Sequence, residues 1–378
     1  MKNTIALSAY LVLFMVAMCA GMEKASADVQ KNFNVEKGGK LIVAVGGGDI
    51  QVRVWDKMQV QMTARNIGDD ADRLKTSQDG NTVRVEYRSD WGWTGSSRDL
   101  RFEFYVPKDF NVDLTTSGGD VRIDGALQGD AAMHTSGGDL TLDGVSGGVN
   151  GKTSGGDITV RDIEGVADLA TAGGDIHVDH AAKDLKISTS GGDISVRTVD
   201  ENLSATTSGG DMNIAKVGGN LSASTSSGDV TVGNVGGNVS LSTSGGDITL
   251  TSGKGKISAN TSGGDVSITD VVGSANVSSS GGTVKVGLTP AGGQTSRISS
   301  SGGDVYLYLP TDAKVTIKAD ISGGEDDQIV TDFPITYKSS GDSGSRQVEC
   351  TLNGGGQEIY LHTSSGNIYI KKSTASTR

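Results

Sequence analysis

A Gly-Gly-Asp unit that returns at a fixed period limits what this chain can fold into. The aspartates of the unit are Asp120, Asp139, Asp157, Asp175, Asp193, Asp211, Asp229, Asp247 and Asp265. The first two aspartates are 19 residues apart, and every later pair of neighbours is 18 residues apart. The same spacing continues to Thr283. After it, an insertion that contains Pro290 makes the spacing irregular. A fixed period of this length is typical of repeat architectures in which one coil stacks on the next.

Each repeat has the pattern of two short strands joined by glycine turns. Leu203 and Ala205 alternate with polar residues before Gly209-Gly210, and Met212 and Ile214 alternate with polar residues after it. Period-2 alternation directs these apolar side chains inward. No segment shows the apolar period of a helix. The sequence therefore predicts an all-β, single-stranded parallel β-helix, or β-solenoid, of 18-residue coils, with strands about 4.8 Å apart.

Threonines and glycines have predicted structural roles at the turns. We expect the glycines to provide backbone angles, often with positive φ, that other residues resist. The threonines before the turn fall on inward parity, so we expect their hydroxyls to bond backbone groups of the corner. They are Thr135, Thr153, Thr171, Thr189, Thr207, Thr225, Thr243 and Thr261.

Aromatic residues divide the chain into sections. None occurs between Asn111 and Val305, although both flanks contain several, so we expect a thin core in the repeats and larger cores at the ends. We predict a signal peptide at 1–27, an N-terminal capping β section at 28–110, regular repeats at 111–304 and a C-terminal β section at 305–378. Both flanks carry the same turn, at Gly48-Asp49 and at Gly366-Asn367, so they are expected to be irregular coils of one solenoid.

The segment 1–27 has the pattern of a secretory signal peptide, with Lys2, an apolar run and a small-x-small site that ends at Ala27. Lipidation at Cys19 is the alternative, although Met18 precedes the cysteine where a small residue is preferred. No second apolar stretch nears the ~20 residues that span a bilayer. We expect an extracytoplasmic protein in the periplasm, on the cell surface or secreted. The net charge of −12 argues against nucleic acid as a partner.

A row of carboxylates about 4.8 Å apart needs an explanation, because each neighbouring pair repels by about 0.9 kcal/mol even in water. The aspartates can accept hydrogen bonds from turn N–H groups, or calcium can bridge them. The second hypothesis makes a cation ladder of Asp139, Asp157, Asp175, Asp193, Asp211, Asp229, Asp247 and Asp265. His177, Asp179 and His180 form another metal candidate, but without a third strong ligand nearby a solvated strand is favoured. No cofactor is predicted.

Two tryptophans lie in a polar loop that contains glycine. Trp91 and Trp93 could stack on sugar rings or enter another protein, and they could equally cover the end of the solenoid. No nucleophile has a recognisable setting: Cys350 lacks an activating context and no G-x-S-x-G elbow occurs. An enzyme should show a coil where a cluster of acidic, basic and aromatic residues breaks the repeat. The repeats show none, so we expect no enzyme activity.

Ordered landmarks resemble a known family. They are Gly48-Asp49-Ile50, Val106-Pro107-Lys108-Asp109, the repeats, Leu309-Pro310 and Thr363-Ser364-Ser365-Gly366-Asn367-Ile368. In these the chain resembles the bacterial putative-adhesin domain of unknown function, a family of exported β-solenoid proteins. The resemblance implies a non-catalytic cell-envelope adhesin or scaffold that binds an unidentified envelope component, surface glycan or protein. It brings no catalytic residues. A polysaccharide-binding or polysaccharide-active β-helix protein is the alternative.

Overall fold

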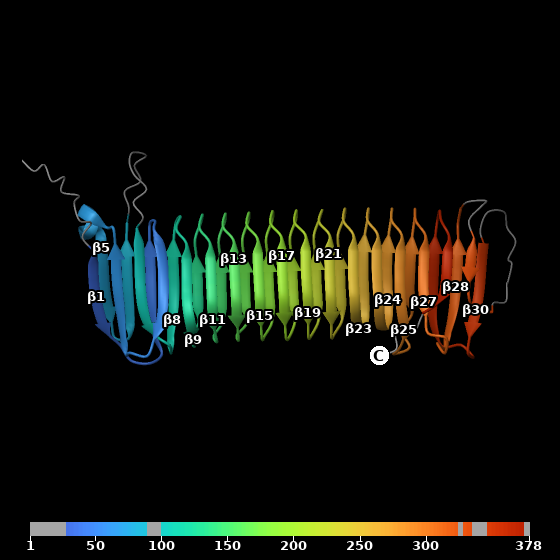
Figure 1. Ribbon diagram of the computed structural model, residues 1–378, viewed down its shortest axis with the longest axis horizontal. Coiled ribbons are helices and arrows are strands. Elements are labelled where there is room, and N and C mark those ends of the chain that lie inside the picture. The colour runs from blue at the N-terminus through green and yellow to red at the C-terminus, as the bar shows by residue number, and fades with distance from the viewer. Residues whose placement is uncertain (1–27, 89–99, 324–327, 335–345, 374–378) are drawn as a thin grey trace, which may run out of the picture.

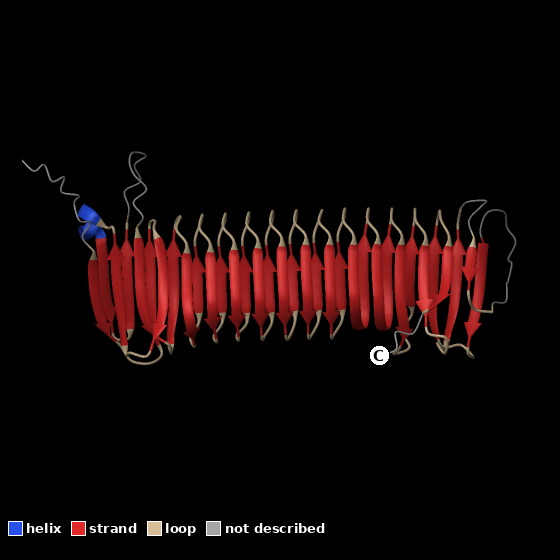
Figure 2. Ribbon diagram, in the orientation of Figure 1, coloured by secondary structure: helices blue, strands red, loops and turns tan. Residues whose placement is uncertain are grey.

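The chain forms a long rod of strands that lie across its axis (Figure 1). The computed structural model describes residues 28–88, 100–323, 328–334 and 346–373. Within these ranges the one helical element is a short 3-10 helix, η1 (Gly68–Arg73), and the rest is strand and turn (Figure 2). The prediction of an all-β solenoid is confirmed.

Regular coils make up the middle of the rod, which we call the shaft. Each coil contributes one strand to each of two rows, and every strand pairs in parallel with its equivalent one repeat on, as Leu203 with Leu221 and Met212 with Val230. The first row holds β8 (Phe110–Thr116), β10 (Ala131–His134), β12 (Val149–Lys152), β14 (Ala167–Ala170), β16 (Leu185–Ser188), β18 (Leu203–Thr206), β20 (Leu221–Ser224) and β22 (Val239–Ser242). The second row holds β9 (Val121–Leu127), β11 (Leu140–Val145), β13 (Ile158–Ile163), β15 (Ile176–Ala181), β17 (Ile194–Val199), β19 (Met212–Val217) and β21 (Val230–Val235). Two long strands, β23 (Ile248–Thr261) and β24 (Val266–Ser279), then run through both rows.

The core of the shaft is a narrow stack of aliphatic side chains. Strand β18 alternates buried and exposed residues, so that Leu203 and Ala205 are inside, and Met212 and Ile214 meet them from β19. The parity prediction is therefore confirmed. Because the side chains of one coil lie directly above those of the next, each coil is stabilised mainly by its two neighbours.

The N-terminal coils do not stack in chain order. Their strands are β1 (Val29–Asn34), β2 (Gly39–Val45), β3 (Asp49–Trp55), β4 (Gln59–Arg65), β5 (Leu74–Asp79), β6 (Thr82–Tyr87) and β7 (Arg101–Pro107). The first row begins β5-β6-β2-β8 and the second begins β1-β4-β7-β3-β9. The coil of β2 and β3 thus lies between the shaft and the later coil of β6 and β7. Strands β1, β4 and β5 are antiparallel to their neighbours and close the end.

The C-terminal end repeats this inversion. Its strands are β25 (Val284–Pro290), β26 (Ser296–Ser300), β27 (Val305–Leu309), β28 (Val315–Ile321), β29 (Ile329–Thr331), β30 (Arg346–Leu352), β31 (Gln357–Thr363) and β32 (Ile368–Lys372). The first row ends β24-β26-β31-β28-β30 and the second ends β24-β25-β27-β32-β29. Within the described residues each row has 17 strands, and their 16 steps of about 4.8 Å make a rod about 77 Å long.

The corner glycines of the shaft are required for a reason other than the predicted one. Among the described residues, no glycine of a shaft Gly-Gly-Asp corner has a positive φ. A Cβ on Gly210 would instead overlap the carbonyl oxygen of Gly192 in the preceding coil, whereas one on Gly209 would meet its nearest atom at 3.4 Å. The positive-φ expectation is therefore wrong for these corners. It holds at the end coils, where φ is +96° at Gly48 and +136° at Gly366.

Candidate functional site along the shaft

The aspartates of the repeated corner form a continuous hydrogen-bonded row. Asp193 Oδ1 accepts the backbone N–H of Asp211 at 2.8 Å, and Asp211 Oδ1 accepts that of Asp229 at 2.8 Å. The same bond joins each aspartate of the shaft from Asp120 to Asp265 to the next coil. These bonds are the turn-capping role that the sequence suggested. Bridging by calcium stays an untested alternative hypothesis. In the described ranges no three or more His, Cys, Asp or Glu side chains gather closely enough to hold a metal ion.

The threonines of the corner bond backbone groups of two coils, as predicted. Thr207 Oγ1 donates to the carbonyl of Gly192 at 3.0 Å and accepts from the N–H of Gly210 at 3.3 Å. Ser279 and Ser300 make the same pair of bonds where the repeat has serine. The repeated Thr-Ser-Gly-Gly-Asp sequence is thus a structural corner in which both the Thr and the Asp side chains bond backbone groups.

A second polar row runs along the opposite corner, and sequence reasoning missed it. Asn202 Oδ1 accepts the N–H of Asn220 at 2.8 Å, and Asn220 Oδ1 accepts that of Asn238 at 2.9 Å. The row begins at Asp184, whose Oδ1 accepts the N–H of Asn202, and ends at the N–H of Lys256. Asn220 and Asn238 each follow a Gly-Gly pair, one repeat apart, so the signal was present in the sequence.

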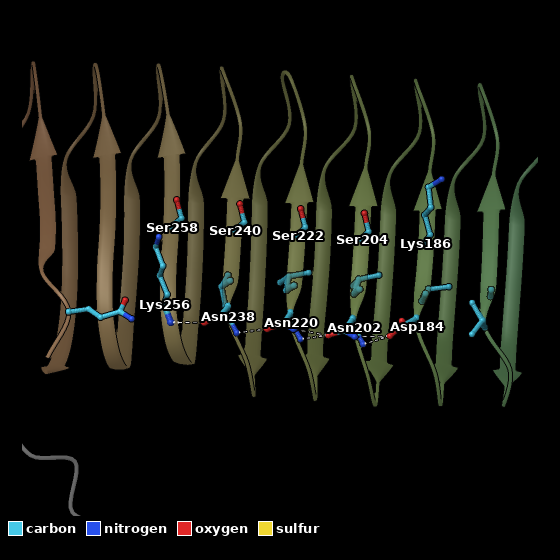
Figure 3. Close-up of a pocket in the computed structure, with 17 residues that line it drawn as sticks. Asp184, Lys186, Asn202, Ser204, Asn220, Ser222, Asn238, Ser240, Lys256 and Ser258 are labelled. Atoms are coloured by element: carbon cyan, nitrogen blue, oxygen red, sulfur yellow. Dashed lines mark hydrogen bonds between the residues drawn. The ribbon is translucent and has the colours of Figure 1, made fainter. Parts of the chain in front are cut away.

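This asparagine row forms one wall of a shallow groove on the outer face of the first row (Figure 3). The other wall is a row of serines, and the groove has a volume of about 770 Å³. It crosses strands β14 to β23, which are six coils and about 24 Å at 4.8 Å per step. The serines are Ser204, Ser222, Ser240 and Ser258.

Charge is confined to the ends of the groove. Asp184 and Lys186 lie at one end and Lys256 at the other, while the walls between them carry amides and hydroxyls (Figure 3). The hydroxyl row arises because every outward position two residues after the asparagine is a serine. Such a surface can exchange many neutral hydrogen bonds with a partner, but it presents no charged group along its middle coils.

The outer face of the second row is more strongly charged. Arg161 pairs with Asp143 at 2.7 Å across adjacent coils. His180 lies between two carboxylates, with Nδ1 2.6 Å from Asp162 and Nε2 3.2 Å from Asp200. Hydrogen bonds to Asp162 and then Asp200 raise the pKa of His180 above its ordinary value.

The predicted His177-Asp179-His180 group is only partly brought together. His177 Nε2 lies 3.4 Å from Asp179, and both side chains point outward as expected. His180 instead meets carboxylates of the neighbouring coils. Its partner Asp162 lies one repeat earlier in the chain, so this neighbour could have been found by applying the period.

The chain matches a family model over most of its length. The model describes the Toastrack DUF4097 domain, and it matches residues 39–218 and again residues 197–371. The chain belongs to the Toastrack family. The resemblance drawn from the repeated corner and its flanking landmarks is thereby confirmed.

Solved structures similar to this Toastrack chain come from three bacteria. A putative adhesin of Bacteroides fragilis is 16% identical, with a TM-score of 0.30, over 67% of this chain and 97% of that one. A putative adhesin of Parabacteroides distasonis is 12% identical, with a TM-score of 0.31, over 75% and 97%. A putative cell adhesion protein of Clostridium sporogenes is 10% identical, with a TM-score of 0.18, over 92% and 100%. No curated protein matches the chain significantly.

Three sequence-predicted positions of the Toastrack chain lie outside the described residues: Trp91, Trp93 and Cys19. Cys350 is described and buried, and burial raises the pKa of its thiol. Among the described segments, no helix has the length and apolar character needed to cross a membrane.

Proposed function

We propose that this Toastrack protein is an exported cell-envelope protein whose shaft serves as a non-catalytic adhesin or scaffold. One observation carries the proposal: in the middle of the groove, successive coils present the same amide and hydroxyl pair, Asn202 with Ser204, Asn220 with Ser222, and Asn238 with Ser240. A catalytic site needs one distinctive group of reacting side chains at one place. A uniform face instead suits many equivalent weak contacts with an extended partner.

The rigidity of the corners supports this role. Each coil is tied to the next by strand pairing, by an aspartate bond and by a threonine bond, as at Asp211 and Thr207. A face held in this way loses little conformational entropy when it binds. The partner is an envelope component, a surface glycan or a protein, and export rests on the signal peptide that the sequence predicts at 1–27.

A polysaccharide-binding role is the second candidate, and the composition of the groove favours it. Rows of serine hydroxyls and asparagine amides at a constant spacing complement a neutral polymer that repeats its own hydroxyl groups. A polyanion would gain little, because the middle coils between Lys186 and Lys256 offer no cation in the groove walls.

Binding by residues 28–378 to envelope fractions and to a glycan array tests both candidates. The groove variant Ser222→Arg with Ser240→Arg places two bulky cations in the groove, and we expect at least tenfold weaker binding. The control, Asn213→Arg with Thr231→Arg, adds the same charge at exposed positions of the second row and should bind as the wild type does.

Absence of wild-type binding to every fraction and glycan would contradict the proposal. Equal losses in the two double variants would show that the groove is not the contact surface. Trp91→Ala with Trp93→Ala, measured in the same assay, separates binding through that loop from binding through the shaft. Fractionation of a Cys19→Ala variant tests anchoring, since lipidation predicts release of the variant from membranes.

A further inference from the structure

A cluster of ionisable side chains lies on the outer face of β28 and β31, where the regular repeat has ended. Lys318 Nζ bonds Glu358 Oε1 at 3.0 Å, and the Tyr360 hydroxyl donates to Glu358 Oε2 at 3.0 Å. A cavity of about 460 Å³ lies beside them, lined by the polar residues Lys318, Asp320, Gln347, Glu349, Tyr360 and His362 and by the apolar residues Ala319, Val348 and Leu361. This is the kind of acidic, basic and aromatic cluster that the uniform coils of the shaft lack.

His362 joins a carboxylate to a hydroxyl at the edge of this cavity. Its Nδ1 lies 3.2 Å from Asp320 Oδ2, and its Nε2 lies 3.4 Å from Ser364 Oγ. The arrangement follows from the sheet, because Asp320 pairs with His362 across parallel strands. Ser364 lies just beyond the end of β31, in the bend where the chain leaves the strand.

The other three histidines do not have this arrangement. His177 and His180 meet carboxylates alone, and the structure gives His134 no carboxylate, within the described residues. His134 and Ser136 nevertheless occupy the same places in their coil as His362 and Ser364, two residues apart around the corner threonine. The acidic partner on the neighbouring strand is therefore what distinguishes the C-terminal site.

The carboxylate of Asp320 is directed toward His362. Oδ2 meets the imidazole and also accepts the Ser322 hydroxyl at 3.2 Å, whereas Oδ1 is buried without a hydrogen-bond partner in the described chain. In the tautomer that carries its proton on Nδ1, the His362 ring donates to Oδ2 and keeps Nε2 as the acceptor for the Ser364 proton. Ser364 is exposed and can be reached by a substrate.

We propose that Ser364, His362 and Asp320 form a hydrolytic site for short-chain acyl esters. Ser364 Oγ attacks the ester carbonyl carbon, and its proton passes to His362 Nε2. His362 then gives this proton to the leaving alcohol oxygen as the carbon–oxygen bond breaks. Water attacks the acyl-serine with His362 again accepting a proton, and the carboxylic acid leaves as Ser364 regains its hydrogen. Water is the only co-reactant.

The cavity borders Asp320 and His362, but Ser364 is not among its lining residues. Because the lining combines Lys318 and Tyr360 with apolar side chains, it does not restrict the ester to a polar alcohol. The site shares no residue with the shaft groove, so this proposal and the proposed adhesive function succeed or fail separately.

Labelling by a fluorophosphonate probe, followed by peptide mass spectrometry of residues 28–378, tests the nucleophile. We expect one labelled serine, Ser364, and no label in Ser364→Ala. Initial rates with p-nitrophenyl acetate and glucose pentaacetate should fall at least 100-fold in Ser364→Ala and His362→Asn, the scale of general-base catalysis. Ser136→Ala and His134→Asn are matched controls that should keep the wild-type rate.

Asp320 acts through His362 as a positioning residue, so its test needs a separate readout. Asp320→Asn should lower kcat and shift the acidic limb of the pH–rate profile, where the general base gains its proton, while leaving KM nearly unchanged. Circular dichroism should confirm that the fold is kept. The absence of any labelled serine, or an unchanged rate in Ser364→Ala, would overturn the proposal.

Discussion

The two glycines of each corner should differ sharply in their tolerance of a side chain. In the corner at Gly209-Gly210, a Cβ on the first residue has 3.4 Å of space, and one on the second overlaps the carbonyl oxygen of Gly192. The sequence shows the same asymmetry, since Ser227 replaces the first glycine in one coil. The second position is glycine in every coil of the shaft.

The expected free-energy changes follow from this geometry. Gly210→Ala must move one coil away from its neighbour, which weakens the adjacent strand bonds and costs about 3 kcal/mol or more, the upper end of overpacking penalties. Gly209→Ala meets ordinary contact at a φ that alanine accepts, so it should change the unfolding free energy by less than about 1 kcal/mol, with a small gain from the stiffer unfolded chain.

Hydrogen exchange of the purified protein is the appropriate assay, because a long stack of coils need not unfold in one step. Peptides from the strands on either side of the corner should lose protection in Gly210→Ala and keep it in Gly209→Ala. Thermal midpoints should rank the variants in the same order. Equal effects in the two variants would refute the argument that close coil stacking, and not backbone angle, selects this glycine.

Three further predictions concern the corner and the charged face. Thr207→Val should destabilise the fold by about 2 kcal/mol, because it leaves buried backbone groups of Gly192 and Gly210 without a partner. Thr207→Ser should cost only about 0.8 kcal/mol, for the lost methyl group. Denaturation midpoints of both variants measure the difference. The raised pKa of His180 means that its bonds to two carboxylates stabilise the fold fully below about pH 6.5 and that this contribution fades as pH rises through the folded pKa, so the difference in melting temperature between wild type and His180→Gln should be larger at about pH 5.5 than at about pH 9. Backbone N–H groups already bond the aspartate row, so melting in calcium and in a chelator should give the same midpoint, and a calcium-dependent rise would instead support the cation ladder.

The constant spacing of the Gly-Gly-Asp unit and the alternation of apolar and polar residues were sufficient to predict the shaft from the sequence. Once the spacing placed Thr207 inward beside a double glycine, its role at the corner followed from the bonds that a buried hydroxyl must make. The repeat spacing also predicts which residue lies beside His180, because Asp162 lies one repeat earlier. The groove was harder to predict, because its shape depends on how Asn220 and Ser222 stand relative to one another on a stacked surface.

The ends of the rod could not be predicted in the same way. Strand β2 pairs with β8 and β6, and β31 lies between β26 and β28, through contacts between residues that no fixed period relates. The C-terminal site depends on such a pairing, because β28 brings Asp320 to His362 from 42 residues away. Nothing in the local sequence around Ser364 marks that partner.

The end coils, stacked out of chain order, close both ends of the rod that one chain forms. Small-angle X-ray scattering of residues 28–378 measures the length of this rod in solution. We predict a maximum dimension of about 80 Å, the rod length with its turns, that stays constant as protein concentration rises. A length that increases with concentration would show that coils stack end to end between molecules, and a compact particle of about half that length would contradict the fold.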